Sequence, residues 1–412
     1  MSGPDGRCIR KRPMLRTDTD SGRTVPQLPL EIVTMEILSR LPVKSLLRFR
    51  SVCKAWRSVI SDDLSLVGSH LQHQPQASSL LVFPVLMCGR PDHDDHHRYA
   101  AEKEKQRSCS SMAFYRWEPS PLAKAVSLVH AVDGMAPMQR CPFVPHDVLA
   151  HCDGLVLVAT RERKAFGLGR DPRSGAYKAA RYFHREVLVV ATGWDELTTG
   201  MEVFTIGTDR RWREVATQPP YPVIPGRTAT SFKGSLLWTV DEAYLGVGAT
   251  APGFLRLSLE DETFGVTPPP PCHPRLNYFS STLSELRGEL CVGRTLEPNI
   301  LEMWMSEDAV RPRWERRYAI RDAVQPPYLP HPVAASDERI VFHDLQGSDS
   351  DHSDVFVCDY SFRTQAFKRI VKMHRLRGYH HERPGAGIAA AAQIFVIPYR
   401  ENLLQLNNYI VQ

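Results

Sequence analysis

The chain has 412 residues, of which 42% are hydrophobic and 24% charged, a composition typical of soluble globular proteins with two or three domains. Its formal net charge of +5 is small for this length and does not favour nucleic-acid binding, which needs a concentrated basic stripe. No run approaches the ~20 apolar residues of a membrane span, so neither nucleic acid nor a membrane is expected as a partner.

The first 24 residues are polar and rich in Gly, Pro, Asp and Arg, which predicts a disordered N-terminal tail over 1–24. Within it, Arg10-Lys11-Arg12 is too short to distinguish a nuclear address from an ordinary solvated tail. The tail has no apolar leader, and the nine cysteines of the chain are dispersed with no CxxC pair. We therefore expect a reducing compartment, the cytoplasm and/or the nucleus.

Residues 28–41 carry apolar side chains at steps of three and four, the spacing of one face of an α-helix. The set is Leu28, Ile32, Met35, Leu38 and Leu41. Pro42 lacks a backbone donor and disfavours helical geometry at Leu41, so the first helix should end there and a second should begin.

Two further short helices are predicted within 43–61. The second has Val43, Leu46 and Leu47 on one face, and the third has Cys53, Trp56, Val59 and Ile60. A unit of ~40 residues is near the lower limit for independent folding, and three short helices cannot bury all of this apolar surface. The surplus indicates that a helix of another protein packs here.

This segment resembles the F-box of plant F-box proteins. The matching residues are Leu28-Pro29, Glu36-Ile37-Leu38, Arg40 to Arg50, Val52-Cys53-Lys54 and Trp56. The resemblance implies an F-box over 25–70, whose opening Leu-Pro and first two helices bind the Skp-type adaptor of a ubiquitin ligase. It assigns adaptor contact to Leu28, Pro29, Ile32, Ile37, Leu38, Leu41, Pro42, Val43 and Leu46. Cys53 and Trp56 are expected to be partly core.

The spacing departs from the family pattern at one point. From Leu28-Pro29 to Glu36-Ile37-Leu38 the chain is one residue longer than usual, as if Thr34 or Met35 were inserted. One residue turns a helix by about 100°, so either the helix starts irregularly or the first contact residues are displaced. Taken alone, the apolar stripe would also fit a helical hairpin in which it is ordinary core.

From about residue 78 to 400 the helical periodicity vanishes, and Pro and Gly separate short apolar runs, as in all-β folds. Four-strand units recur, and the last strand of each carries an aromatic residue. The clearest units span 229–266, 282–318 and 333–370, and the aromatic residues are Trp212, Phe264, Trp314 and Phe367. Four strands repeated every ~50 residues are typical of kelch-like propeller blades.

Weaker units fit at 78–128 and 147–180, and the unit ending at Trp212 is short, as if a strand were missing. The expected fold class is α+β multidomain: a small three-helix F-box, then an all-β propeller of six or seven blades over 78–400. Gln393 to Ile397 is expected to add a strand that closes the ring, because an open array leaves unpaired backbone at both ends. An irregular β-sandwich is the alternative.

This half also resembles the F-box-associated β domains of plant proteins. Cys152 to Leu157 is similar to their early CDGLL-type strand, and Glu302 to Met305 is similar to their later IEIW-type strand. The resemblance implies a protein-recognition surface built from loops at one end of the ring, without naming binding residues.

The sequence contains no recognisable motif for catalysis or cofactor binding, since it has no GxSxG elbow, HExxH pair or Walker loop. Gly167-Leu168-Gly169 has no helical pattern after it and indicates a loop between strands. The histidine clusters Asp92 to His97 and His380-His381 indicate charged loops rather than zinc sites. We expect no catalytic, cofactor-binding or metal-ligating residues. An enzyme site assembled in the channel of the ring is the remaining alternative.

Together these features predict a substrate-recognition subunit of an SCF-type (Skp–cullin–F-box) ubiquitin ligase. The F-box would dock the adaptor and, through it, the cullin and RING subunits, while the β domain would capture an unknown target protein. Such a subunit is not itself an enzyme: holding a target near the charged ubiquitin carrier raises its effective concentration. A non-degradative adaptor-bound regulator and a lectin-like glycan receptor are the alternatives.

Overall fold

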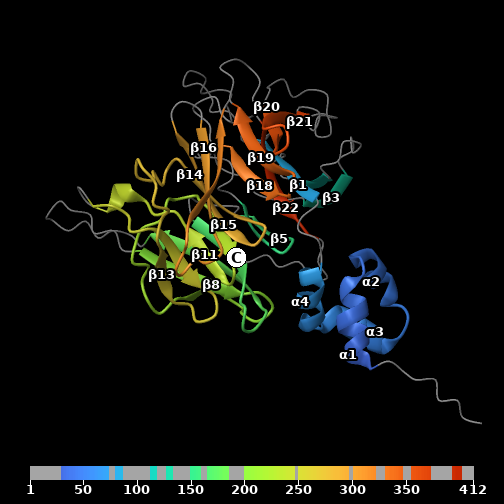
Figure 1. The fold of residues 1–412 in the computed structure, drawn as a ribbon. Coiled ribbons are helices and arrows are strands. Elements are labelled where there is room, and N and C mark those ends of the chain that lie inside the picture. The colour runs from blue at the N-terminus through green and yellow to red at the C-terminus, as the bar shows by residue number, and fades with distance from the viewer. Residues whose placement is uncertain are drawn as a thin grey trace, which may run out of the picture.

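A computed structural model describes residues 29–73, 79–86, 112–117, 127–132, 149–158, 165–184, 199–245, 249–296, 300–321, 330–346, 354–372 and 392–400. An N-terminal helical unit is followed by antiparallel sheets arranged as a propeller (Figure 1). The predicted tail over 1–24 and the histidine clusters at 92–97 and 380–381 lie outside the described residues. Among the residues that are described, no helix is long and apolar enough to cross a membrane.

Within residues 29–73 the helical unit has four α-helices, so the prediction of three is wrong. They are α1 (Leu30–Ile32), α2 (Val43–Phe49), α3 (Lys54–Asp62) and α4 (Leu64–His73), with a π-helical turn η1 (Val33–Ile37) and a 3₁₀ turn η2 (Leu38–Arg40) after α1. The additional helix, α4, is capped by Asp63, whose Oδ1 accepts a hydrogen bond from Ser65 N at 2.8 Å. Three of its side chains enter the core: Leu66, Val67 and Leu71.

The fourth helix, α4, fixes the backbone bend at Leu41, which precedes α2. Leu41 has an extended backbone, with φ −85° and ψ 147°, as expected for the residue before a proline. The buried His70 of α4 donates from Nε2 to the Leu41 carbonyl oxygen at 2.9 Å. This end of the apolar face is therefore covered by the chain itself.

Four blades of the propeller are each built from four consecutive antiparallel strands. The first contains β6 (Ala165–Arg170), β7 (Tyr177–His184), β8 (Thr199–Thr205) and β9 (Arg213–Glu214). The second contains β10 (Thr230–Phe232), β11 (Ser235–Trp238), β12 (Phe254–Ser258) and β13 (Phe264–Thr267), and a short 3₁₀ turn η4 (Glu242–Tyr244) lies between β11 and β12. The third contains β14 (Ser281–Leu286), β15 (Glu289–Leu296), β16 (Ile300–Ser306) and β17 (Glu315–Arg321). The fourth contains β18 (His331–Ala335), β19 (Arg339–Gln346), β20 (Asp354–Ser361) and β21 (Ala366–Lys372).

A fifth four-stranded sheet joins the two ends of the β region. β22 (Ala392–Tyr399) pairs with β1 (Ser79–Leu86), which continues into β2 (Met112–Trp117) and β3 (Ser127–Val132). The antiparallel register of β1 and β22 runs from Ser79↔Tyr399 to Leu86↔Ala392. The prediction of a closing strand near the C-terminus is therefore confirmed, and the pairing removes one exposed strand edge from each end.

The expected number of six or seven blades is wrong for the part of the chain that the structure describes. Beside the four blades and the closing sheet, β4 (Leu149–Cys152) and β5 (Leu155–Val158) form a sheet of only two strands. The unit ending at Trp212 is complete, because β6 and β7 belong to it rather than to the unit predicted at 147–180.

Gly167-Leu168-Gly169, which predicted a loop between strands, lies within strand β6 instead. A Cβ at Gly167 would lie 2.8 Å from Leu236 Cδ1, and one at Gly169 would lie 2.6 Å from Leu259 Cδ1. Glycine thus allows β6 to pack closely against the next blade, although it weakens the local strand pattern.

Burial follows the position of a strand within its blade. All four residues of β11 are buried, whereas most residues of the outer strand β17 are exposed. The recurring aromatic residue anchors the outer strand: Trp314 donates from Nε1 to the Pro268 carbonyl at 2.9 Å, and the ring of Trp212 lies 5.7 Å from that of Phe204. The inner strands β6, β10, β14, β18 and β22 contact one another in this order and surround a central cavity.

Candidate functional site

The structure divides the residues predicted to contact an adaptor into an exposed and a buried group. Pro29, Ile32, Ile37 and Pro42 are exposed, Leu41 is half-buried, and Leu38, Val43 and Leu46 lie in the core of the helical unit. Leu28 lies outside the described residues. The buried group stabilises the unit by packing against α4, and direct adaptor contact by these three side chains stays a prediction.

The extra residue noticed in the sequence is absorbed by the π-helical turn η1. The backbone N–H of Leu38 reaches the carbonyls of both Thr34 and Val33, and the second of these is the five-residue step of a π-helix. Thr34 and Leu38, at the two ends of this wide turn, are both buried. Ile37, which an unbroken α-helix would turn toward the core, is 42% exposed.

Among the side chains of the helical unit that the structure describes, five large apolar ones are exposed, and we call them the exposed apolar set. They are Ile32, Met35, Ile37, Leu47 and Val52. The first three lie on α1 and η1, while the other two lie on α2 and on the turn after it. Sequence reasoning did not assign adaptor contact to Met35, Leu47 or Val52, although Met35 and Leu47 both lay on predicted apolar helix faces.

The third predicted helix begins with an unusual cap. Cys53 was expected to be partly core, which is wrong, because its side chain is exposed and Sγ accepts a hydrogen bond from the Trp56 backbone N–H at 3.4 Å. Trp56 is half-buried as expected, and its ring meets that of Phe49 at 5.4 Å in an edge-to-face contact. The start of α3 is thereby fixed against the end of α2.

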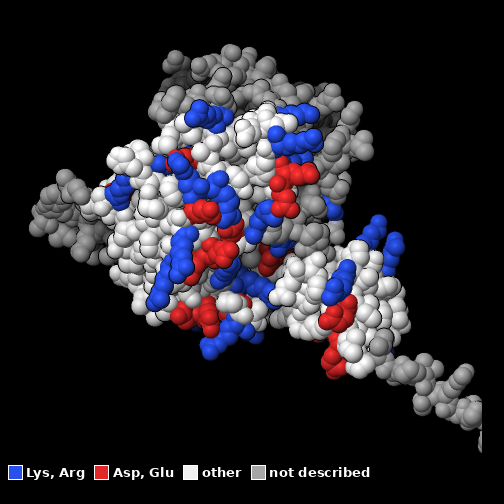
Figure 2. Space-filling view, viewed as in Figure 1, with Lys and Arg blue, Asp and Glu red and all other residues white. Residues whose placement is uncertain are grey.

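Charged side chains border the exposed apolar set. Arg48, Lys54 and Arg57 are exposed, and Glu36 and Arg40 form a solvent-exposed ion pair at 3.0 Å. Figure 2 shows a broad uncharged surface on the helical unit with basic side chains along its upper edge. An apolar surface with a charged rim is the usual anatomy of a protein–protein contact.

The propeller offers a second candidate surface at one end of the ring. Three two-residue turns close the innermost hairpins there: Asp153-Gly154, Lys233-Gly234 and Arg287-Gly288. Both residues of each turn have positive φ, the geometry of type I′ turns, which match the twist of the strands they join. Lys233 and Arg287 are exposed and Asp153 is half-buried, so the turns present polar side chains on loops, where recognition residues are commonly found.

Nothing in the described residues assembles a metal site, since no group of three or more His, Cys, Asp or Glu side chains is placed to hold an ion. The five cysteines that the structure describes are all free thiols. Burial raises the pKa of the Cys291 thiol to about 12, and it raises that of Cys152 further, so neither is a reactive thiolate.

Comparisons with known proteins agree with both parts of the structure. Residues 25–67 match the family model of the F-box domain. An F-box protein of Arabidopsis thaliana is 23% identical over 342 residues, which cover 76% of this chain and 73% of the relative. An F-box/kelch-repeat protein of the same plant is 26% identical over 295 residues, 65% of this chain and 68% of the relative.

Similarity to solved structures is weaker. The Aleuria aurantia lectin aligns with 72% of this chain and 97% of its own, at 8% identity and a TM-score of 0.32, which carries no argument about function. The chain therefore carries an F-box domain followed by a β-propeller, and it is similar to plant F-box proteins.

Proposed function

We propose that this chain is the substrate-recognition subunit of an SCF-type ubiquitin ligase. The observation that carries the proposal is an F-box domain whose apolar side chains remain exposed after α4 has filled the core. The partner is a Skp-type adaptor and, through it, cullin and RING subunits, in the cytoplasm and/or the nucleus. The chain supplies no chemistry and acts by position.

The exposed apolar set supplies the driving force for adaptor binding. Each Leu, Ile, Val or Met side chain that becomes fully buried contributes roughly 1.5–3 kcal/mol of transfer free energy. Only part of this becomes affinity, because association orders both partners. The buried residues Leu38, Val43 and Leu46 act indirectly, by holding α1, η1 and α2 in place.

The propeller captures the target protein. The turns at Asp153-Gly154, Lys233-Gly234 and Arg287-Gly288 support this role, since they present polar side chains from a rigid ring. An F-box-associated origin of the β domain fits the CDGLL-like strand at Cys152, which lies in β4 directly before one of these turns. A target held there would experience a raised effective concentration of the ubiquitin carrier.

The decisive experiment places charge in the exposed apolar set. The double variant Ile37→Glu/Leu47→Glu should lose capture of a plant Skp-type adaptor by at least ~100-fold, because two anchors become unpaired charges on burial. Val310→Glu is the matched control, since Val310 is 54% exposed but lies in the propeller. Circular dichroism verifies that all variants remain folded.

Adaptor capture that survives the double variant would contradict the proposal. A reconstituted ligase assay then separates a target receptor from a non-degradative regulator, because only the receptor supports ubiquitin transfer to a captured protein. Glycan-array binding by the full chain without protein capture would favour a lectin-like receptor instead.

A further inference from the structure

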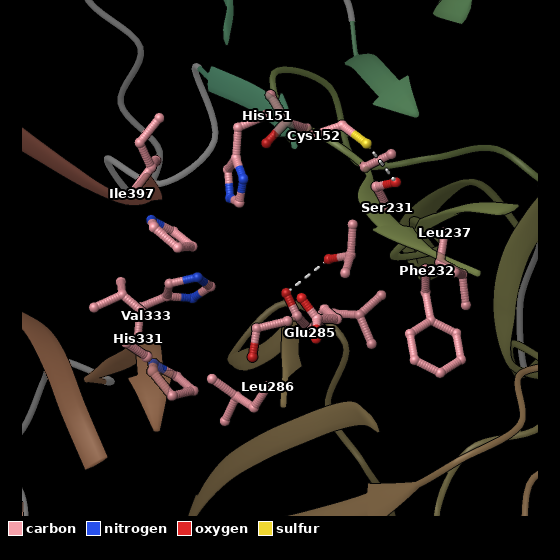
Figure 3. A pocket seen from close by; sticks show the side chains of 18 of the residues that line it. His151, Cys152, Ser231, Phe232, Leu237, Glu285, Leu286, His331, Val333 and Ile397 are labelled. Atoms are coloured by element: carbon pink, nitrogen blue, oxygen red, sulfur yellow. Dashed lines mark hydrogen bonds between the residues drawn. The ribbon is translucent and has the colours of Figure 1, made fainter. Parts of the chain in front are cut away.

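The central cavity of the propeller has the dimensions of a small-molecule site. Its volume is about 620 Å³, within the ~300–1,000 Å³ typical of ligand pockets. Residues of β4, β10, β14, β18 and β22 contribute to its wall (Figure 3), and Arg170 at the end of β6 adds to it. Leu149, Val333 and Val396 make part of this wall apolar.

Three histidines from distant parts of the sequence line the cavity. His151 lies on β4, while His331 on β18 and His343 on β19 are direct cross-strand partners. Figure 3 shows His151 and His331 on one side of the cavity and Phe232 and Leu237 across from them. Imidazoles in an enclosed, partly apolar space can donate, accept or take up a proton.

A buried cation accompanies these histidines. Arg227 is 6% exposed, and its guanidinium donates to the carbonyls of Tyr278 at 2.9 Å and Phe279 at 2.5 Å. These bonds fix the guanidinium but leave its positive charge in the wall of the cavity. Burial, with smaller contributions from His343, His151 and Arg227, lowers the pKa of His331 to about 3. Burial likewise lowers the pKa of His151 to about 4.

The acidic side chains that line the cavity lie toward the end with the three turns, and both are engaged. Asp153 Oδ2 accepts from the Tyr177 hydroxyl at 3.1 Å, and Glu285 Oε1 accepts from the Gly288 N–H at 2.5 Å. The basic residues Arg170, Lys233, Arg287 and Arg400 also line the cavity. Arg227 is thus the buried cation of the cavity, and the imidazoles of His151 and His331 are uncharged at neutral pH.

We propose that this cavity binds a small organic anion, a carboxylate or phosphate ester carried on an apolar body. The anionic group would lie beside Arg227 and the histidines, and the body would contact the apolar wall. Burial disfavours the charged form of these histidines, and an anion beside them stabilises that form, so binding favours proton uptake. The proposal is independent of adaptor docking and concerns the β domain alone.

The test uses the full-length chain and three probes of nearly equal shape: benzoate, phenyl phosphate and neutral benzamide. Isothermal titration calorimetry should detect benzoate or phenyl phosphate with at least ~10-fold higher affinity than benzamide, because charge-assisted hydrogen bonds form only with the anions. Benzoate should bind more tightly at pH 6 than at pH 8, with net proton uptake. Equal binding of benzamide, or no binding of either anion, would overturn the proposal.

Variants locate the site. His331→Gln keeps a hydrogen-bonding side chain but cannot become cationic, and it should weaken anion binding by at least ~10-fold and reduce proton uptake. His151→Gln provides a second, independent variant on another strand. His73→Gln is the matched control, because His73 is exposed on α4, and it should bind as the unmodified chain does. Unchanged anion binding in both cavity variants would place the ligand elsewhere and refute the assignment.

Discussion

Gly68 of α4 lies directly against the guanidinium of Arg170 at the end of β6. A Cβ at position 68 would approach Arg170 Nη2 to 2.8 Å, and the same guanidinium donates from Nε to the Gly175 carbonyl at 3.1 Å. Arg170 also lines the central cavity. The F-box domain is thus joined to the propeller by packing beside the first blade, as well as by the chain between α4 and β1.

Enlarging residue 68 should loosen this contact in proportion to side-chain size. Gly68→Ala requires only a shift of the flexible Arg170 head group and should cost less than about 1 kcal/mol, whereas Gly68→Leu should push α4 from the blade. Hydrogen exchange should then rise in α4 and in the β6–β7 turn. Gln72→Leu, an exposed position on the same helix, serves as the control. Equal protection in Gly68→Leu and the unmodified chain would show that the contact does not hold the domains.

Removing the extra residue of the π-helical turn should separate adaptor binding from stability. Deletion of Met35 allows α1 to continue as a regular helix, removes one member of the exposed apolar set and shifts Ile37 around the helix axis relative to Ile32. We expect adaptor affinity to fall at least ~10-fold while the thermal unfolding midpoint is unchanged or higher. Surface plasmon resonance with the adaptor and a thermal melt provide the two measurements. Full affinity after the deletion would mean that the wide turn does not shape the binding surface.

Replacing the unusual cap of α3 should stabilise the protein. Cys53 Sγ is a weak acceptor at an N-cap position whose backbone, with φ −158° and ψ 170°, is already suitable. Cys53→Ser should therefore raise the free energy of unfolding of the helical unit by about 0.5–1 kcal/mol, and Cys53→Ala should lower it. Chemical denaturation measures the unfolding free energy of both variants. A serine variant no more stable than the alanine variant would contradict the role of residue 53 as an N-cap.

Lys178 should be important for cohesion between the first two blades. Its ammonium lies 3.0 Å from Glu262 Oε1 in the next blade and 3.3 Å from Asp171 Oδ2, and Arg213 also pairs with Glu262. Because Lys178 is buried, Lys178→Met leaves two carboxylates without this cation and should cost about 3 kcal/mol or more. Arg316→Gln, which removes a half-exposed partner of Glu302, should cost less than about 1 kcal/mol. Similar losses of unfolding free energy in both variants, measured by chemical denaturation, would rule out a special role for the buried lysine.

The contribution of Glu262 should disappear in acid. The hydrogen bond from Arg213 is the largest influence on this carboxyl, burial opposes it, and the resulting pKa lies below the ordinary 4.5. The unfolded chain therefore binds this proton first, so the stabilisation is complete above about pH 4.5 and is lost as the pH falls through the lowered value. The difference in unfolding midpoint between the unmodified chain and Glu262→Gln should shrink as the pH falls below 4.5. A difference that stays constant with pH would refute the linkage.

Local patterns predicted the main divisions of the molecule. The helical spacing before Pro42 and the recurring four-strand units reflect interactions between neighbours in the sequence, and the structure has helices and blades at those places. The closing strand near Ile397 was predicted from the general need to pair strand edges. The prediction of a loop at Gly167-Leu168-Gly169 was wrong. These glycines pack in a strand against Leu236 and Leu259, which are remote in sequence.

The sequence by itself determined that an apolar helical unit precedes a repetitive β domain, because periodicity of side chains is a local property. Only the tertiary structure decided which apolar residues remain exposed, since α4 buries Leu38 and Leu46 while η1 turns Ile37 outward. It alone brought His151, His331 and Arg227 around one cavity. Closure of the ring brings together residues from strands far apart in the chain, and no local spacing in the sequence encodes this proximity.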